Sequence, residues 1–141
     1  MKSPVELAVG LCHAFEAQVP AVRLGNEVSD LGQELYHPPT VEGWPGGRAW
    51  INPATLAGRA NLAAALLSGS GGYENRLDPL AIAQKHGRGA PGQTESFLSE
   101  LLLQQEISPD VRKILDASTT LPKGPRAIAT LLAASPEYQL A

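Results

Sequence analysis

The chain has 141 residues, of which 43% are hydrophobic and 18% charged, a composition typical of one folded globular domain. Its net charge of −3 argues against a nucleic-acid partner, and a single cysteine, Cys12, excludes a disulfide framework and a cysteine-rich zinc site. The longest apolar run covers residues 62–67, whereas a membrane span needs about 20 residues. We therefore expect no nucleic-acid partner and no membrane span.

The first helix is predicted over residues 4–18. Ser3, Pro4 and Glu6 have the arrangement of a capping box, in which Ser3 is the N-cap residue and Pro4 occupies the first helical position. A cleaved signal peptide is the alternative interpretation of this region. Because Glu6 lies inside what would be the apolar segment of that signal, we expect the helix.

An N-cap residue directly before proline occurs five times along the chain. The side-chain oxygen of the first residue can accept a hydrogen bond from a free amide of the first turn, where the missing N–H of proline costs nothing. The five pairs are Ser3-Pro4, Asn52-Pro53, Asp78-Pro79, Ser108-Pro109 and Ser135-Pro136. We expect a helix to begin at each pair, the last of them a short terminal turn.

Apolar residues at helical spacing extend these starts and add three more helices. The further helices are expected over residues 23–35, 53–68, 79–85, 94–105, 109–117 and 125–134. No stretch shows the sustained alternation of polar and apolar residues that a strand requires. The predicted fold class is therefore all-α: an irregular helical bundle of about six to seven helices, with a long Trp-, Gly- and Pro-rich loop between the second and third helices.

Glycine-rich stretches over residues 68–72 and 87–92 subdivide the expected single helical domain, residues 1–141. The predicted parts are N-terminal helices with the Trp loop over residues 1–68, a flexible connection with a short helix over 69–93, and C-terminal helices over 94–141.

The loop from Tyr36 to Asn52 is seventeen residues long and contains both tryptophans. A loop of this length inside a compact domain is usually functional or packed by its own side chains. In one interpretation, Trp44 and Trp50 form an aromatic platform for a sugar ring or for an apolar side chain of a partner. In the other, both rings fill the gap between the two flanking helices.

Polar residues around the tryptophans complete the candidate site. Arg48 and Asn52 are expected to contact a ligand or partner together with Trp44 and Trp50. Arg59, on the following helix, is expected to point at Glu42 of the loop or at a helix C-terminus. The alternative is that it joins Arg48 in binding an anion.

Catalytic and metal-binding patterns are weak in this sequence. His37 and Glu42 are the candidate general acid and base, but no nucleophile motif accompanies them. The three histidines are far apart and form no ligand pattern, so we expect no metal site. A glycine-rich phosphate loop is also missing, so we expect no cofactor. Cys12 is interpreted as a small buried residue.

Several segments follow one another in an order typical of a known family. They are Lys2–Leu7, Leu31–Gln33, His37–Pro39, Gly43–Gly47, Trp50–Asn52 with Leu56, Arg59 and Asn61, and Ala133–Gln139. Together they resemble the C-terminal region of the bacterial domain of unknown function 1800 family. The resemblance implies that the chain is a C-terminal fragment of a longer, exported protein of the periplasm or cell surface. It implies no reaction and no catalytic residues.

The expected function is that of a non-catalytic helical module of an exported bacterial protein. Its Tyr36–Asn52 loop would contact another protein, the missing N-terminal region of its own chain, or a glycan. One alternative is a hydrolase-like active site that the missing region completes, with His37, Glu42 and Arg48 contributing. A further alternative is a purely structural cap. Whether the chain is an enzyme stays open, and its residues favour a non-catalytic role.

Overall fold

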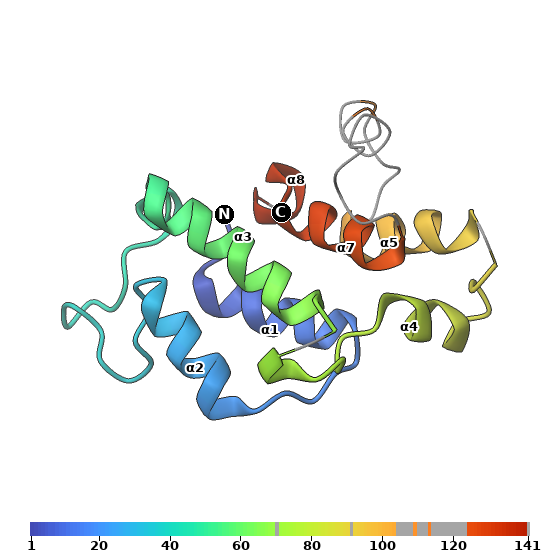
Figure 1. Cartoon of the computed structure of the whole chain (residues 1–141). Coiled ribbons are helices and arrows are strands. Elements are labelled where there is room, and N and C mark those ends of the chain that lie inside the picture. The colour runs from blue at the N-terminus through green and yellow to red at the C-terminus, as the bar shows by residue number, and fades with distance from the viewer. Residues whose placement is uncertain (70, 91, 104–108, 110–112, 114–123, 141) are drawn as a thin grey trace.

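The computed structural model describes residues 1–69, 71–90, 92–103, 109, 113 and 124–140. Across these residues the protein is a bundle of helices without strands, which confirms the all-α prediction (Figure 1). No helix in this part of the chain is both long and apolar enough to span a membrane. Most of the helix predicted over residues 109–117, and the end of the one predicted over 94–105, lie outside the described residues.

The first helix, α1 (Pro4–Ala14), begins with the predicted capping box. Ser3 Oγ accepts a hydrogen bond from the Glu6 amide at 3.2 Å, and Glu6 Oε2 accepts one from the Ser3 amide at 2.6 Å. The helix ends four residues earlier than predicted. Glu16 takes a left-handed conformation with φ of +49°, and its carboxylate contacts Lys85 and His86 of a distant segment, so tertiary contacts end this helix.

The second helix, α2 (Ala21–Asp30), also ends earlier than its predicted limit at residue 35. Gly32 adopts a φ of +93° and donates a backbone hydrogen bond to Ser29 O at 2.8 Å, so the chain leaves the helix there. Val28 and Leu31 are buried, but Leu35 is 43% exposed. The predicted apolar face of this helix therefore does not extend to Leu35.

The third helix, α3 (Pro53–Leu67), matches its predicted limits within one residue. Asn52 Oδ1 accepts a hydrogen bond from the Thr55 amide at 2.9 Å, and Thr55 Oγ1 accepts one from the Asn52 amide at the same distance. A short 3-10 helix, η1 (Gly47–Trp50), directly precedes this cap. The polar cap thus fixes where the long connection from α2 ends.

The other helices complete the bundle. In chain order they are η2 (Gly71–Tyr73), α4 (Pro79–Lys85), α5 (Gln93–Leu103), α7 (Pro125–Ala134) and α8 (Pro136–Leu140). Asp78 caps α4 by accepting hydrogen bonds from two amides of its first turn, as predicted. Both α4 and α7 start at their predicted prolines, and the short terminal helix α8 follows Ser135 as expected.

A continuous hydrophobic core joins α1, α3, α5 and α7, each of which contributes a fully buried leucine. These residues are Leu7, Leu66, Leu98 and Leu132. The last turn, α8, returns to the start of the chain, so both ends lie close together in Figure 1. There the Lys2 amide donates a hydrogen bond to Gln139 O at 2.9 Å.

Candidate functional site

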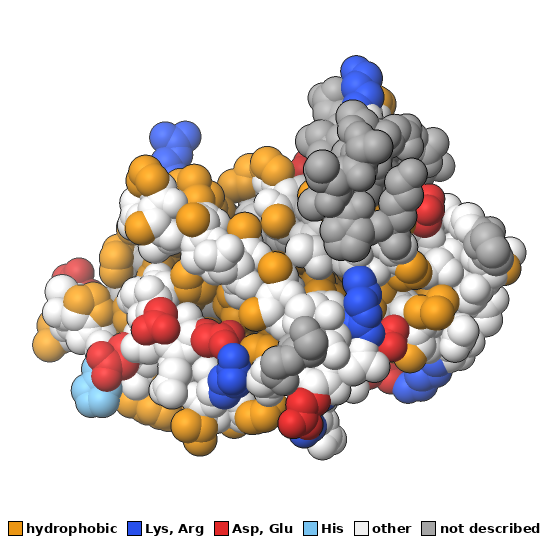
Figure 2. Space-filling view, viewed as in Figure 1, with side chains coloured by type: hydrophobic (Ala, Val, Ile, Leu, Met, Phe, Trp, Pro, Cys, Tyr) orange, Lys and Arg blue, Asp and Glu red, His pale blue; other side chains and the backbone are white. Residues whose placement is uncertain are grey.

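The connection between α2 and α3 presents large apolar side chains to solvent. Within the described residues, five of the exposed large hydrophobic side chains lie between positions 35 and 56: Leu35, Tyr36, Val41, Ile51 and Leu56. We call this set the connection face. Figure 2 shows hydrophobic side chains at the surface of this end of the molecule, with acidic side chains beside them. Exposed apolar side chains of one segment are candidates for an interaction surface.

The tip of the connection is held by a tight turn. The Gly43 amide donates a hydrogen bond to Thr40 O at 3.0 Å, and Thr40 Oγ1 donates one to Gly43 O at 3.2 Å. Gly43 has a φ of +98°, which favours glycine. Val41 is therefore exposed on an ordered turn.

Tyr36 occupies an unusual backbone conformation at the start of this loop. Its φ of +70° lies in the left-handed region, which is unfavourable for a residue with a Cβ atom. Its side chain is 94% exposed, so burial of the ring does not offset this strain. Strain at an exposed aromatic residue is a feature associated with function.

The two tryptophans of the connection are in different environments. Trp50, in η1, is buried, and its carbonyl accepts a hydrogen bond from Thr55 Oγ1 at 2.9 Å. It therefore anchors the connection to the first turn of α3, as the gap-filling interpretation expects. Trp44 is half-buried and keeps part of its ring in solvent.

The polar candidates of the connection do not form one cluster. His37 Nδ1 lies 3.3 Å from Glu34 Oε1, and both side chains are largely exposed. In the part of the chain that the structure describes, no hydrogen bond or ion pair joins His37 to Glu42, and Arg48 has no ion-pair partner. Asn52 serves as the N-cap of α3.

Arg59, within α3, is buried, with 1% of its surface exposed. Its Nε donates a hydrogen bond to Gln139 Oε1 at 2.7 Å, and its Nη2 donates one to the Lys2 carbonyl. Burial lowers the pKa of Arg59, although a guanidinium stays charged. The expected tie to Glu42 is therefore wrong, because the partners of Arg59 are at the two ends of the chain.

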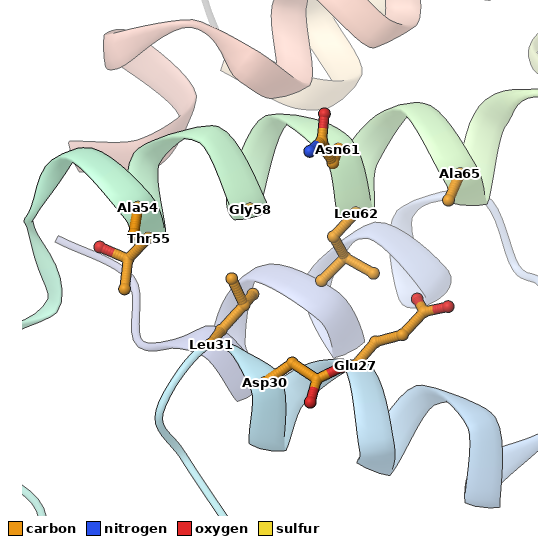
Figure 3. A pocket seen from close by; sticks show the side chains of 9 residues that line it. All are labelled: Glu27, Asp30, Leu31, Ala54, Thr55, Gly58, Asn61, Leu62 and Ala65. Atoms are coloured by element: carbon orange, nitrogen blue, oxygen red, sulfur yellow. The ribbon is translucent and has the colours of Figure 1, made fainter.

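A groove of about 320 Å³ lies between α2 and α3 (Figure 3). Leu31, which directly follows α2, and Leu62 of α3 approach each other in it, and small residues of α3 form much of its wall. Glu27 and Asp30 line the α2 side. Neither acidic residue was predicted from the sequence as part of the site. The available signal was the spacing of Glu27 and Asp30, which places two carboxylates three residues apart on one helical face.

Glu27 is held in place by two partners. Its Oε2 accepts a hydrogen bond from the Tyr73 hydroxyl at 2.7 Å, and its Oε1 accepts one from Arg23 Nε at 3.2 Å. Burial and the bond to Glu27 raise the pKa of Tyr73, so this hydroxyl remains a donor. Asp30 is exposed and has no hydrogen-bond or ion-pair partner among the described residues.

No group of three His, Cys, Asp or Glu side chains within the described ranges is arranged to hold a metal ion. His13 is exposed, whereas its neighbour Cys12 is buried, as the sequence predicts, and burial raises the pKa of the Cys12 thiol. A high thiol pKa disfavours the reactive thiolate. Cys12 therefore acts as a packing residue.

Comparison with known proteins places this geometry in a family. A family model described as "Protein of unknown function (DUF1800)" matches residues 1–140, a range that includes the connection face and the groove. No curated protein and no solved structure matches the chain. The segments over residues 31–61 already pointed to the same family. The chain belongs to the DUF1800 family of proteins of unknown function.

Proposed function

We propose that this chain is a polypeptide-docking module and that the connection face is its contact surface. The observation that carries the proposal is the exposure of Tyr36 and Val41 at ordered positions of one loop. Exposing apolar surface is unfavourable by about 25 cal/mol per Å², and a docked partner would remove that surface from water. The strained backbone of Tyr36 supports the same role, because the exposed ring contributes little to the fold.

The chemistry of the face favours a polypeptide over a glycan. Leu35, Val41 and Ile51 are aliphatic, and they offer neither a flat ring nor a hydrogen bond to a sugar. Tyrosine beside aliphatic residues is common at the centre of protein interfaces. A glycan platform requires an accessible indole face, whereas Trp50 is buried.

The positions of the candidate catalytic residues support binding in preference to hydrolysis. His37 is paired with Glu34 on the surface, and within the described residues no hydrogen bond or ion pair joins it to Glu42. A general acid and base must reach the same substrate atoms, so residues dispersed in this way do not form a reaction centre by themselves.

Site-specific photocrosslinking tests the proposal. A benzophenone amino acid replaces Val41 in cells that produce the protein, and the matched control carries it at Val22, which is 81% exposed on the first turn of α2. We expect a discrete adduct from position 41 and none from position 22. Adding Tyr36→Ala should abolish that adduct, because the substitution removes the aromatic ring of the face.

The masses of the adducts distinguish the outcomes. A defined polypeptide attached at position 41 supports docking, and peptide mapping identifies it as another protein or as a further part of a longer chain. Equal, diffuse labelling from both positions would refute the proposal. Intrinsic tryptophan fluorescence, titrated with soluble glycans, tests the alternative, and a saturable shift lost in Trp44→Ala would favour a sugar ligand.

A further inference from the structure

We propose that the groove between α2 and α3 receives a basic, leucine-bearing helical segment of the partner polypeptide. The inference rests on the proposed function, because the groove adjoins the connection face: Leu31, at the C-terminal end of α2, lines it, and so do Ala54 and Thr55, in the first turn of α3. It specifies the chemistry of the partner.

The groove follows one face of α3. Helix α1 packs against both α2 and α3. The space between α2 and α3 is therefore open on the side that faces away from α1 (Figure 3). The wall formed by α3 includes Ala54 and Ala65, which extend over about 16 Å at 1.5 Å per residue. Such small side chains let the backbone of another helix approach closely.

The depth of the groove depends on Gly58. A methyl group at this position would lie 2.7 Å from Leu31 Cδ2, which is closer than van der Waals contact allows. Glycine therefore permits Leu31 to pack against the backbone of α3. With Leu62 from the other side, Leu31 forms an apolar floor that fits leucine side chains of a partner (Figure 3).

The charge of the groove selects a basic partner. Glu27 is already oriented by Tyr73 and Arg23. The Asp30 carboxylate has no hydrogen-bond or ion-pair partner within the described residues, so it is free to pair with a cation of the partner. Residues 21–52 contain four carboxylates and two guanidinium groups, so this side of the molecule carries excess negative charge. Lysine or arginine on the partner would complement it. A small organic amine would pair with Asp30 but would leave the apolar floor uncovered.

Synthetic peptides test this assignment. The probe is a peptide of about four turns with leucine at every third or fourth position and lysine elsewhere. A scrambled peptide has the same composition without the amphipathic pattern, and a charge-reversed peptide has glutamate in place of lysine. Binding is measured by fluorescence anisotropy, and the site is mapped by the NMR shifts of the Gly58, Asn61 and Ala65 amides.

We expect only the amphipathic basic peptide to bind, with weaker binding at high salt. Asp30→Asn should weaken its affinity about two- to fivefold, the range for one exposed charge pair, and adding Glu27→Gln should bring the loss to about tenfold. Glu95→Gln, an exposed control on α5, should leave the affinity unchanged. Thermal unfolding verifies that each variant is folded.

Equal binding of the scrambled or charge-reversed peptide would overturn the assignment, and so would shifts that map away from the groove. Concentration-dependent self-association that Asp30→Asn abolishes would identify a second copy as the occupant instead. The two proposals fail separately. If position 41 still crosslinks to a partner in the Asp30→Asn variant with unchanged yield, docking stands and the groove assignment is wrong.

Discussion

Two regions of the molecule depart from the usual distribution of side chains, in which charged residues are exposed and apolar residues are buried. One is the place where the two ends of the chain meet, and the other is the connection between α2 and α3. At the ends, the charged residue Arg59 is 1% exposed and its hydrogen bonds join three segments. At the connection, the apolar residues Tyr36 and Val41 face solvent. The first region uses a polar group to hold the fold together, whereas the second holds apolar groups that the fold does not use. We infer that stability depends on the ends and docking on the connection.

The end region contains further contacts of the same kind. Lys2 Nζ donates a hydrogen bond to the Tyr138 carbonyl at 2.5 Å and lies 3.7 Å from the centre of the Tyr138 ring. Burial raises the pKa of Tyr138 to about 12, so its hydroxyl is neutral at physiological pH. Gln139 Nε2 donates a hydrogen bond to Ala133 O at 2.8 Å. Substitutions in this region should therefore reduce stability without a direct effect on a partner.

Arg59→Ala should produce the largest loss of stability. The substitution leaves Gln139 Oε1 and the Lys2 carbonyl without their buried donor and opens a cavity, which together should cost about 3 kcal/mol or more. Urea unfolding measures the change. Arg48→Ala is the matched control. Because Arg48 is exposed, the free energy of unfolding of this variant should stay within about 0.5 kcal/mol of the parent value. Similar free energies of unfolding for Arg59→Ala and Arg48→Ala would contradict the inference that stability depends on the chain ends.

Helix starts were predictable from the sequence, but helix ends were less so. An N-cap residue before proline is a local signal, and the caps at Ser3, Asn52 and Asp78 form as predicted. The ends of α1 and α2 depend on left-handed residues at Glu16 and Gly32. The first is held by contacts to residues about 70 positions away, which periodicity does not report.

The place of the long connection was also easier to predict than the contacts of the candidate residues. Proline, glycine and tryptophan marked the connection because they are local features of the chain. The partners of Arg59 are 57 and 80 residues away, and no local pattern encodes such a bond. Asp30 was missed because an exposed carboxylate on a helix resembles any other solvated residue, until the structure places it beside an apolar groove.

Asn52→Ala should have the next largest effect. It removes the N-cap of α3, where Asn52 and Thr55 bond to each other, so a loss of about 1–2 kcal/mol is expected. Because Trp50 lies two residues away, its emission should also shift to longer wavelength as the anchor loosens. The control is Asn26→Ala, an exposed position of α2, for which neither quantity should change appreciably. An unchanged free energy of unfolding in Asn52→Ala would mean that the cap does not anchor the connection.

Asp78→Asn tests whether the charge of Asp78 contributes to stability in a pH-dependent way. Burial alone would raise the pKa of Asp78, but the amides of Ala81 and Leu80 and the charge of Arg126 hold this pKa below its usual value. A lowered folded-state pKa contributes stability above the unfolded value of about 3.9, and this stability is lost as the pH falls through the folded pKa. The variant should be about 1 kcal/mol less stable at pH 7, and the difference should disappear at strongly acidic pH. Urea unfolding across this range measures it, and a difference independent of pH would exclude a role for the charge.

Tyr36→Gly should have the smallest effect on stability, and in the opposite direction. Glycine relieves the left-handed strain at φ +70°, and the greater freedom of glycine in the unfolded chain offsets part of the gain, so the net increase should be about 0.5 kcal/mol. Tyr36→Ala also removes the exposed ring but keeps the Cβ atom, so its stability should match that of the parent.

Both Tyr36 variants should lose the crosslink from position 41, while only Tyr36→Gly gains stability. If Tyr36→Gly proves less stable than Tyr36→Ala, the strain is absent in solution and the contrast between the two regions weakens. If stability rises as docking falls, the fold tolerates a strained backbone in order to present the ring, since a residue kept for the fold alone would lose stability when removed.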